Sequence, residues 1–371
     1  MHILQIIDTF NIGGAQKLLE LFGSEALNQN FRVSFICLSD RKKSPIGLDL
    51  EKKGFAVKYF PAKMMFDVKR IGQINLALLK DRPDLIHTNL LYSNILGGLL
   101  GWTFRIPVVA TLHLTSSDSR NSKVKDWIES QVLRYLDRRV IAVGKKTAEA
   151  NQTRLHGKKI DVIPNAVSSE ELITNQERLK IRQEIMNSDR GILLISAGRF
   201  SVSKNFGDLI RAFELIHNDF PESRLVLAGD GKTMRSMQDL AANLHLTEFI
   251  KFLGQRNDVP RLLAASDLFL SSSIEEGMPL VILEALVAGL PVVATEVGDI
   301  PRLITDDFGI LVPPRQPPKI ADAVIELLKD RPRMNRLGEN SRIYAKQNIA
   351  SKTWMAKYLD LYAEVLKKRI E

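Results

Sequence analysis

Short runs rich in β-branched residues alternate along this chain with stretches of helical periodicity, and the alternation occurs twice. In the first half the predicted strands are Ile3–Ile7, Val33–Leu38, Ala56–Phe60, Leu85–His87, Pro107–Leu112, Arg139–Val143 and Ile160–Ile163. From Gly191 the pattern restarts with Ile192–Ala197, Arg224–Ala228, Ile250–Leu253, Leu268–Leu270, Pro291–Ala294 and Ile310–Val312. Strand–helix alternation builds parallel sheets with helices on both faces. The sequence therefore predicts an α/β protein with two doubly wound, Rossmann-like domains in tandem.

Polar composition marks the expected boundary between these domains. Residues 165–190 are rich in Ser, Glu, Asn and Gln and predict a linker. We therefore expect an N-terminal domain over residues 1–167 and a C-terminal domain over residues 190–351. Apolar residues at helical spacing in Ser351–Ile370 predict an amphipathic terminal helix.

Cysteine usage and hydropathy exclude several classes of protein. The only cysteine, Cys37, lies in an apolar run, which rules out an intrachain disulfide and predicts a buried thiol. The segment Met1–Asp8 lacks the basic start of a secretory signal and predicts a strand instead. No run reaches the roughly 18 apolar residues of a membrane span. We expect a protein that is cytoplasmic or peripheral on the inner face of the membrane.

Positive charge is concentrated in the N-terminal half. Residues 1–160 hold 25 Lys and Arg against 14 Asp and Glu, whereas residues 161–371 hold 27 against 29. This excess indicates either a solvated basic face or a polyanionic partner. Because no nucleic-acid-binding motif accompanies it, we expect no nucleic-acid partner and favour an anionic membrane surface. Lys63–Arg70 mixes apolar and basic residues as interfacial segments do, although a core-facing helix would have a similar pattern.

Several catalytic motifs are missing from the sequence. There is no Walker loop, no His-Glu-x-x-His zinc motif and no Gly-x-Ser-x-Gly elbow. The turn that begins Gly229-Asp230-Gly231 has Met234 where the dinucleotide fingerprint needs glycine. No two aspartates stand two positions apart, so an Asp-x-Asp metal clamp is absent. These absences disfavour hydride transfer and zinc chemistry.

The most specific stretch runs from Ser271 to Ala285 and predicts a strand, a loop and a helix. Pro279 suits the first turn of this helix, since its missing N–H would be unpaired there. Glu276 falls in the loop, and Glu284 lies eight residues later within an otherwise apolar helix. A carboxylate buried without a partner is costly. Glu284 is therefore either a solvated residue on the helix face or a ligand for a polar group.

Ordered sequence blocks resemble those of family 4, or group 1, glycosyltransferases, which are retaining enzymes of GT-B fold. Glu276 and Glu284 match the family's two glutamates separated by seven residues. The other matching blocks are Ile12–Ala15, Thr111–His113, Val162–Asn165, Ala197–Arg199 with Lys204 and Asn205, Leu227–Gly231 and Phe252–Gly254. The resemblance implies a GT-B fold, in which the two domains face a central cleft and the C-terminal helix, residues 352–371, crosses back to the N-terminal domain.

The resemblance also implies an activity. It predicts a retaining hexosyltransferase that moves a hexose or N-acetylhexosamine from a nucleotide sugar to a glycan acceptor, without a cofactor or metal. UDP-sugars are favoured over GDP-mannose as donors. The expected acceptor is a lipid-linked oligosaccharide, lipopolysaccharide or exopolysaccharide precursor of the cell envelope. The alternatives are a nucleotide-sugar epimerase or phosphorylase of the same fold, and a non-catalytic carbohydrate-binding protein.

A nucleoside diphosphate that departs gathers negative charge, and a site without a metal must meet this charge with cations and backbone donors. Arg199 and Lys204 follow a predicted strand and suit phosphate oxygens, although both would also suit a solvated surface. Gly13 and Gly14 open a predicted helix, where they either admit a phosphate to the helix N–H groups or form an ordinary turn.

By resemblance, Glu276 holds hydroxyls of the donor sugar and Glu284 holds the ribose, while His113 orients the sugar near its anomeric carbon. The predicted catalytic residues are His113, Arg199, Lys204 and Glu276. The predicted nucleotide-sugar contacts are Gly13, Gly14, Arg199, Lys204, Gly229, Gly277, Met278, Pro279, Leu280 and Glu284. His87 follows another predicted strand and lines the acceptor cleft or lies in the core. The sequence departs from the family pattern at Asp299 and Arg302, in a loop that usually lies near the donor.

Overall fold

The chain forms two compact units in a computed structural model. The structure describes residues 1–11, 13–27, 29–39, 44–62, 64–113, 123–168, 173–186 and 191–367. The N-terminal unit comprises Met1–Ala166 together with Ser351–Glu371, and the C-terminal unit comprises Val167–Ala350. The terminal helix therefore belongs to the N-terminal unit, as expected of a GT-B protein. Each unit is described separately below.

The N-terminal unit contains a seven-stranded parallel sheet with the strand order β3-β2-β1-β4-β5-β6-β7. Its strands are β1 (His2–Ile7), β2 (Arg32–Cys37), β3 (Ala56–Tyr59), β4 (Leu85–Asn89), β5 (Val108–Leu112), β6 (Arg139–Ala142) and β7 (Ile160–Val162). The chain order reverses between β1 and β4. Ligands of open parallel sheets bind beyond the carboxyl ends of the strands at such a reversal.

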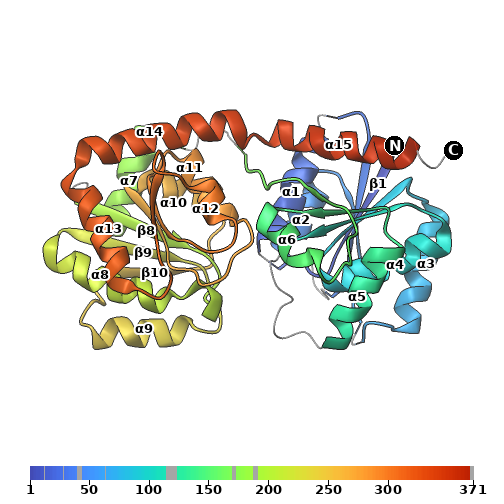
Figure 1. Cartoon of the computed structure of the whole chain (residues 1–371), viewed down its shortest axis with the longest axis horizontal. Helices are drawn as coiled ribbons and strands as arrows, with labels where there is room; N and C mark the ends of the chain where they lie inside the picture. Colours follow the sequence, from blue (N-terminus) through green and yellow to red (C-terminus); the bar gives the residue numbers. More distant parts are fainter. Residues whose placement is uncertain are drawn as a thin grey trace. The chain divides into compact units, whose positions relative to one another are not determined.

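Helices cover both faces of this sheet (Figure 1). They are α1 (Gly14–Ala26), α2 (Pro45–Lys52), α3 (Val68–Lys80), α4 (Leu91–Phe104), α5 (Lys123–Tyr135), α6 (Lys145–Gln152) and α15 (Ser351–Lys367). Side chains of α3 and α4 pack on one face of the sheet in a core that includes Ile74, Leu96 and Ile86. On the other face α15 lies beside α1, where Phe22 of α1 contacts the rings of Trp354 and Tyr358.

The C-terminal unit contains a six-stranded parallel sheet with the strand order β10-β9-β8-β11-β12-β13. Its strands are β8 (Ile192–Ala197), β9 (Ser223–Ala228), β10 (Ile250–Gly254), β11 (Leu268–Ser271), β12 (Val292–Thr295) and β13 (Gly309–Val312). Its helices are α7 (Asn175–Met186), the 3-10 helix η1 (Val202–Lys204), α8 (Phe206–Asp219), α9 (Met234–Asn243), α10 (Val259–Ala265), α11 (Leu280–Val287), α12 (Ile300–Leu303), α13 (Pro317–Lys329) and α14 (Arg331–Asn348). Here the reversal lies between β8 and β11. Each of the thirteen predicted strands overlaps an observed strand.

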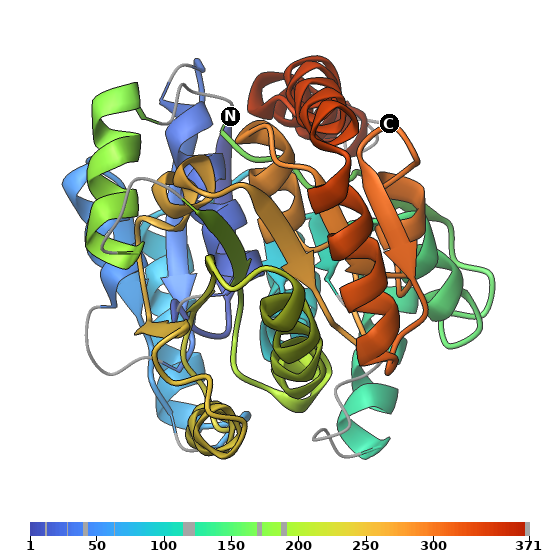
Figure 2. The same ribbon diagram turned by 90° about the vertical axis from the view of Figure 1, so that its left-hand side faces the viewer.

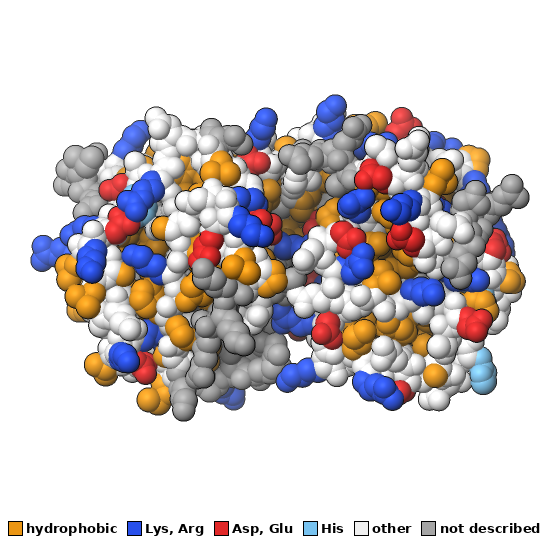
Figure 3. Space-filling view, turned by 180° about the vertical axis from the view of Figure 1, so that it is seen from behind, with side chains coloured by type: hydrophobic (Ala, Val, Ile, Leu, Met, Phe, Trp, Pro, Cys, Tyr) orange, Lys and Arg blue, Asp and Glu red, His pale blue; other side chains and the backbone are white. Residues whose placement is uncertain are grey.

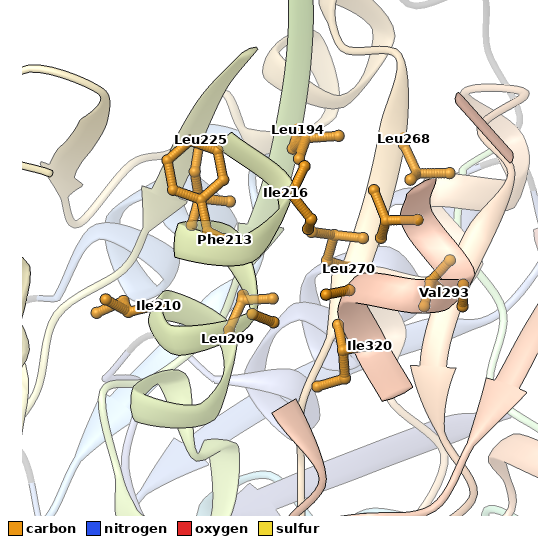
Figure 4. Close-up of a cluster of buried hydrophobic side chains, with 14 of the residues drawn as sticks. Leu194, Leu209, Ile210, Phe213, Ile216, Leu225, Leu268, Leu270, Val293 and Ile320 are labelled. Carbon is orange, nitrogen blue, oxygen red and sulfur yellow. The ribbon is translucent and has the colours of Figure 1, made fainter. Parts of the chain in front are cut away.

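The core of the C-terminal unit lies between its sheet and the helices α8 and α13 (Figure 2). Leu194 and Leu270 from neighbouring strands meet Phe213 and Ile216 of α8 and Ile320 of α13 (Figure 4). All five side chains are buried. Burial of a side chain of this size contributes roughly 1.5–3 kcal/mol relative to exposure. This packing makes the sheet a rigid support for the loops at its edges.

The prediction of a linker over residues 165–190 is wrong for its central part, because residues 175–186 form α7. Thr174 and Glu177 form a capping box, in which each residue's backbone N–H donates to the other's side chain. Arg182 is buried and donates to the carbonyl oxygen of Ala265 at 3.0 Å and to Asp267 at 3.0 Å. The C-terminal unit thus begins at Val167 and not at 190. Residues 169–172 and 187–190 lie outside the described residues.

In the part of the chain that the structure describes, none of the helices combines the length and the apolar character that a membrane crossing requires. Cys37 is buried at the end of β2, as predicted.

Candidate active site

The predicted donor-site residues of the C-terminal unit follow three neighbouring strands. Arg199 and Lys204 follow β8, Gly229 follows β9 and Glu276 follows β11. These strands are adjacent in the order β9-β8-β11, and all are parallel. Their carboxyl ends therefore share one edge of the sheet, at the reversal where ligands of such sheets bind.

Lys204 and Glu276 form an ion pair at this edge. The Lys204 Nζ donates to Glu276 Oε1, and the same oxygen accepts a hydrogen bond from Ser273 Oγ at 2.7 Å. The Lys204 side chain is 21% exposed and the Glu276 side chain 11%, so the pair is largely screened from water. Removing one member of such a pair leaves the other charge without compensation. The alternative of a solvated surface cation is therefore wrong for Lys204.

Hydrogen bonds join the loop that follows β11 to the loop that follows β8. Ser272 Oγ donates to the carbonyl oxygens of Lys204 at 3.1 Å and Asn205 at 2.9 Å. The backbone N–H of Ile274 donates to the carbonyl of Ser203 at 2.8 Å. The sequence analysis assigned no role to the run Ser271-Ser272-Ser273. The sequence nevertheless contains a pattern that could have identified this run, since three consecutive serines directly follow an apolar predicted strand.

Two glycines allow the backbone of these loops to pack closely. Gly229 has φ of +141°, and a Cβ there would lie 1.9 Å from the carbonyl oxygen of Gly198. Gly298 has φ of +57°, and a Cβ there would lie 2.0 Å from the carbonyl oxygen of Glu276. Any larger residue would displace the neighbouring loop. Both glycines therefore support the geometry around Lys204 and Glu276.

The segment Gly277–Leu280 leads from this loop into α11. Gly277 is buried, Met278 is half-buried and Leu280 is the first helical residue. Pro279 has an extended conformation, with φ −73° and ψ 120°, so it caps the helix and does not form its first turn as predicted. Glu284 is half-buried on α11, one face of which packs in the unit's interior.

Arg199 is exposed and separate from this ion pair. Among the residues that the structure describes, it makes no hydrogen bond or ion pair. The structure therefore brings Lys204 and Glu276 together, whereas Arg199 is exposed on the loop that follows β8 and is not part of the pair.

In the N-terminal unit, Gly13 and Gly14 stand at the start of α1, shortly after β1. Gly13 is the capping residue in an extended conformation, and Gly14 begins the helix. Ile12, the first residue of this block, lies outside the described residues. Asp8 at the end of β1 accepts hydrogen bonds from the backbone N–H groups of Tyr92 at 3.1 Å and Ser93 at 2.6 Å. Burial raises the pKa of Asp8 to about 6, and the sequence analysis did not single this residue out.

His113 lies directly after β5 and is half-buried. Its Nε2 is 3.1 Å from the Oδ1 of Asn89, at the end of the neighbouring strand β4. Burial lowers the pKa of His113 to about 4, so the imidazole is neutral at pH 7. A neutral imidazole donates one hydrogen bond and accepts another, which suits the recognition of hydroxyl groups.

His87 lies within β4 and is buried, so it belongs to the core and not to an exposed cleft surface. Burial lowers the pKa of His87 to about 3, with a smaller contribution from His113. Both histidines are therefore neutral, and they interact electrostatically, with His87 in β4 and His113 directly after the neighbouring strand β5.

Comparison with known proteins identifies the family of this chain. The family described as "Glycosyltransferase Family 4" matches residues 12–171, and that described as "Glycosyl transferases group 1" matches residues 177–344. The N-acetyl-alpha-D-glucosaminyl L-malate synthase of Bacillus anthracis is 31% identical over 271 residues, which are 71% of this chain and 69% of the relative. The UDP-Gal:alpha-D-GlcNAc-diphosphoundecaprenol alpha-1,3-galactosyltransferase of Escherichia coli is 28% identical over 91% of this chain and 90% of the relative.

The fold also matches solved structures. The crystal structure of Anabaena Alr3699/HepE in complex with UDP-glucose superposes with a TM-score of 0.88 and 22% identity, covering 98% of this chain and 100% of that one. The fold, the family matches and the relatives define a GT-B glycosyltransferase. The chain belongs to the group 1, family 4 glycosyltransferases.

Proposed function

We propose that this glycosyltransferase moves a hexose or N-acetylhexosamine from a UDP-sugar to a lipid-linked glycan, with retention of the anomeric configuration. The observation that carries the proposal is the ion pair of Lys204 and Glu276 at the carboxyl ends of β8 and β11. The Escherichia coli relative, whose name records UDP-Gal and a diphosphoundecaprenol acceptor, and the Anabaena protein, whose structure contains UDP-glucose, support this direction. The galactosyltransferase name also records an alpha linkage.

The donor is held by charges of both signs. Lys204 uses one N–H on Glu276 and has further N–H groups for oxygens of the diphosphate. Arg199, exposed on the same loop, adds a planar set of donors for the same group. Glu276 accepts hydrogen bonds from sugar hydroxyls, Glu284 accepts them from the ribose, and backbone groups of Gly229 and Gly277–Leu280 line the nucleotide. The backbone N–H groups at Gly13 and Gly14 offer a further phosphate contact.

The reaction breaks the bond between the anomeric carbon and the phosphate oxygen, and it forms a bond from the acceptor oxygen on the same face. The acceptor hydroxyl gives its proton to the departing phosphate, so the products are the glycosylated acceptor and UDP. His113 hydrogen-bonds the sugar and orients it. It does not take the proton, because its low pKa makes it a poor base at neutral pH.

Cationic side chains and backbone donors stabilise the departing diphosphate in this proposal, so no metal is required. Transfer assayed with and without a chelator tests this part directly. Equal rates support it, and loss of activity that Mg²⁺ or Mn²⁺ restores contradicts it.

The first experiment is a thermal-shift panel of UDP- and GDP-sugars, followed by acceptor-dependent release of the nucleotide. A ligand at 100 times its Kd stabilises the folded protein by about 2.7 kcal/mol. We expect a shift with a UDP-sugar and UDP release that requires a glycan acceptor. Epimerised sugar, or sugar phosphate released without an acceptor, would indicate an epimerase or a phosphorylase. Binding without any turnover would indicate a carbohydrate-binding protein.

We also propose that the N-terminal unit contacts an anionic membrane, where a lipid-linked acceptor would reside. One face of α3 packs in the core through Ile74 and Leu78. Its opposite face exposes Val68 by 84%, Leu76 by 60% and Leu79 by 69%. At 3.6 residues per turn these three positions fall within about a quarter of the helix circumference.

Basic side chains flank this apolar stripe. Lys69 and Lys80 are exposed on α3, whereas Arg70 is buried and donates to the carbonyl oxygen of Leu38. Within Lys63–Arg70, the buried Arg70 fits the core-facing interpretation, whereas the exposed Val68 and Lys69 support the proposal of an interfacial segment. Lys63 lies outside the described residues. Figure 3 shows hydrophobic side chains next to Lys and Arg side chains on the surface. Apolar and cationic groups together favour anionic lipid headgroups.

Co-sedimentation with vesicles tests the membrane contact. We expect binding to phosphatidylglycerol vesicles at low salt, weaker binding at high salt, and little binding to phosphatidylcholine. The double substitution L76S/L79S should reduce binding, whereas L215S, at an exposed leucine of α8, should not. Equal binding of the two variants would contradict the assignment to α3.

A further inference from the structure

Polar side chains occupy one face of the N-terminal sheet where apolar side chains would be expected. The strand register pairs Gln5 with His87 and Asn89 with Thr111, so these four residues share the face covered by α15. All four are buried. Buried polar groups add stability only when every one is hydrogen-bonded, and apolar residues would usually stabilise such a layer as well. Stability alone therefore does not account for this row.

Hydrogen bonds link the row into a chain that ends at His113. Tyr362 of α15 places its hydroxyl 2.6 Å from His87 Nδ1, and Gln5 Nε2 lies 3.1 Å from the same nitrogen. Asn89 Nδ2 donates to Gln5 Oε1 at 3.1 Å, and Asn89 Oδ1 is 3.1 Å from His113 Nε2. The sequence positions 362 and 113 are thus connected by four hydrogen bonds.

The donors and acceptors fix one direction along this chain. An amide nitrogen only donates, so Gln5 makes His87 Nδ1 an acceptor. The single lone pair of this nitrogen accepts mainly from the Tyr362 hydroxyl at 2.6 Å, with Gln5 Nε2 as the longer contact at 3.1 Å. His87 therefore carries its proton on Nε2, which lies 2.7 Å from Thr111 Oγ1. The carbonyl oxygen of Asn89 only accepts, so His113 also carries its proton on Nε2.

This assignment leaves His113 Nδ1 with a lone pair. Among the described residues no partner contacts that nitrogen, and the side chain is half-buried. A hydroxyl group is the hydrogen-bond donor that such a nitrogen would recognise, since a carbonyl or carboxylate would be repelled.

We propose that Tyr362 is a positioning residue for His113: it sets the order of the amides of Gln5 and Asn89, and thereby holds His113 with Nδ1 free to accept a substrate hydroxyl. The opposite order, with both amides turned over and His87 Nδ1 donating, would deprive the Tyr362 proton of its 2.6 Å acceptor. Without the hydroxyl the two orders become closer in free energy. The part of the inference that concerns substrate rests on the proposed function.

Aromatic packing holds Tyr362 in place for this task. Its ring lies 5.8 Å from the His87 ring and 6.3 Å from the Phe22 ring, measured between centroids. Tyr358 lies between Tyr362 and Trp354 on the same helix, with ring centroids 5.9 Å and 4.9 Å from them. The tyrosine is fully buried, and burial raises its pKa well above the ordinary value, so the hydroxyl stays protonated.

NMR of protein labelled with 15N-histidine tests the tautomer without any need for activity. Y362F removes only the hydroxyl, and Y344F is the matched control because Tyr344 packs against Phe308 in the C-terminal unit. We expect His113 to show the Nε2-protonated tautomer in the wild type and Y344F, and a mixture in Y362F. H113Q assigns the signal by its loss. A His113 signal unchanged in Y362F would overturn the proposal.

Kinetics test the functional part. We expect Y362F to lower kcat by about 10-fold, equivalent to one hydrogen bond of about 1.4 kcal/mol, with the donor KM changed less than about twofold. In an H113Q background the same substitution should have no further effect, since Tyr362 acts through His113. Additive losses would show that Tyr362 acts elsewhere. If Y362F folds poorly, Q5M is the second variant, because it interrupts the series of hydrogen bonds between Tyr362 and His113 at its middle. It should reproduce both the mixture of His113 tautomers and the lower kcat.

The NMR and kinetic experiments distinguish a failure of this inference from a failure of the proposed function. If no nucleotide sugar is turned over by the wild type, the proposed function fails while the NMR comparison still decides the tautomer. If transfer is observed but Y362F changes neither the tautomer nor kcat, the inference fails and the proposed function stands.

Discussion

The predicted site residues of the two units differ in their physical character. In the C-terminal unit they are charged: Lys204 pairs with Glu276, and Arg199 is exposed nearby on the same loop. In the N-terminal unit the two histidines are neutral, with His87 buried and His113 half-buried, and burial lowers the pKa of both far below the ordinary value. Fixed charge suits a group whose charge changes during a reaction, and fixed neutral donors suit a group that must be oriented.

Because of this difference, substitutions in the two units should affect different measured properties. Loss of a charge in the C-terminal unit should act on the transition state in which the diphosphate departs. Loss of a neutral group in the N-terminal unit should act on orientation, and on stability in acid. The following predictions are ordered by the size of the expected effect.

The largest effect is expected for the ion pair. K204A and E276A should each lower turnover by about 100-fold or more, because transition-state charge on the diphosphate is then poorly matched. The double variant should be little worse than either single variant, since the two residues act as a unit. E326A breaks a surface ion pair with Arg333 in the same unit and serves as the control. Near-normal transfer in K204A and E276A would contradict the role of charged residues in the C-terminal unit.

Acid should destabilise the N-terminal unit through His87. Its folded pKa of about 3 lies below its ordinary pKa, so the unfolded chain binds a proton that the folded chain does not, and stability falls as pH drops below about 6.5. At pH 5 this costs about 2 kcal/mol, or about 30-fold in the unfolding constant.

The measurement is urea unfolding of the wild type and H87Q at pH 7 and pH 5. All three tryptophans, Trp102, Trp127 and Trp354, lie in the N-terminal unit, so their fluorescence reports on that unit. H87Q should reduce the difference between the two pH values by the contribution of His87, about 2 kcal/mol at pH 5. His113, whose pKa is lowered to about 4, acts in the same direction and Asp8, whose pKa is raised to about 6, in the opposite one; both are present in both proteins and cancel from the comparison. An equal pH dependence in both proteins would contradict a neutral buried His87.

A smaller effect is expected for His113. H113Q should lower kcat by about 10-fold, the value of one substrate hydrogen bond. H156Q, at an exposed histidine of the same unit, is the control. A loss as large as that of K204A would show that His113 has more than an orienting role.

The smallest effect is expected for Ser273, which donates to Glu276 without carrying charge. S273A should reduce kcat by about threefold, because one of the hydrogen bonds that hold the carboxylate is lost while the ion pair remains. S236A, at an exposed hydroxyl of α9, is the control. A decrease as large as that of E276A would mean that the hydroxyl itself contacts substrate.

Local patterns were sufficient to predict most of the architecture. Strand and helix periods depend on neighbouring residues, so the thirteen strands and the terminal helix could be predicted from the sequence. The helix α7 was missed because its exposed polar face outweighed the Thr174–Glu177 capping signal, and because Arg182 is buried only through its pairing with Asp267. That pairing joins residues 85 positions apart and has no local signature.

The sequence by itself determined the two-sheet fold and the identity of the residues that follow the strands, since both depend on short-range order and residue type. Only the tertiary structure decided which of these residues meet. It paired Lys204 with Glu276 across 72 positions and left Arg199 exposed and outside this pair. It also brought Tyr362 to His87 across 275 positions. Such contacts depend on how strands and helices pack against one another, and that packing is not encoded in any short segment of the chain.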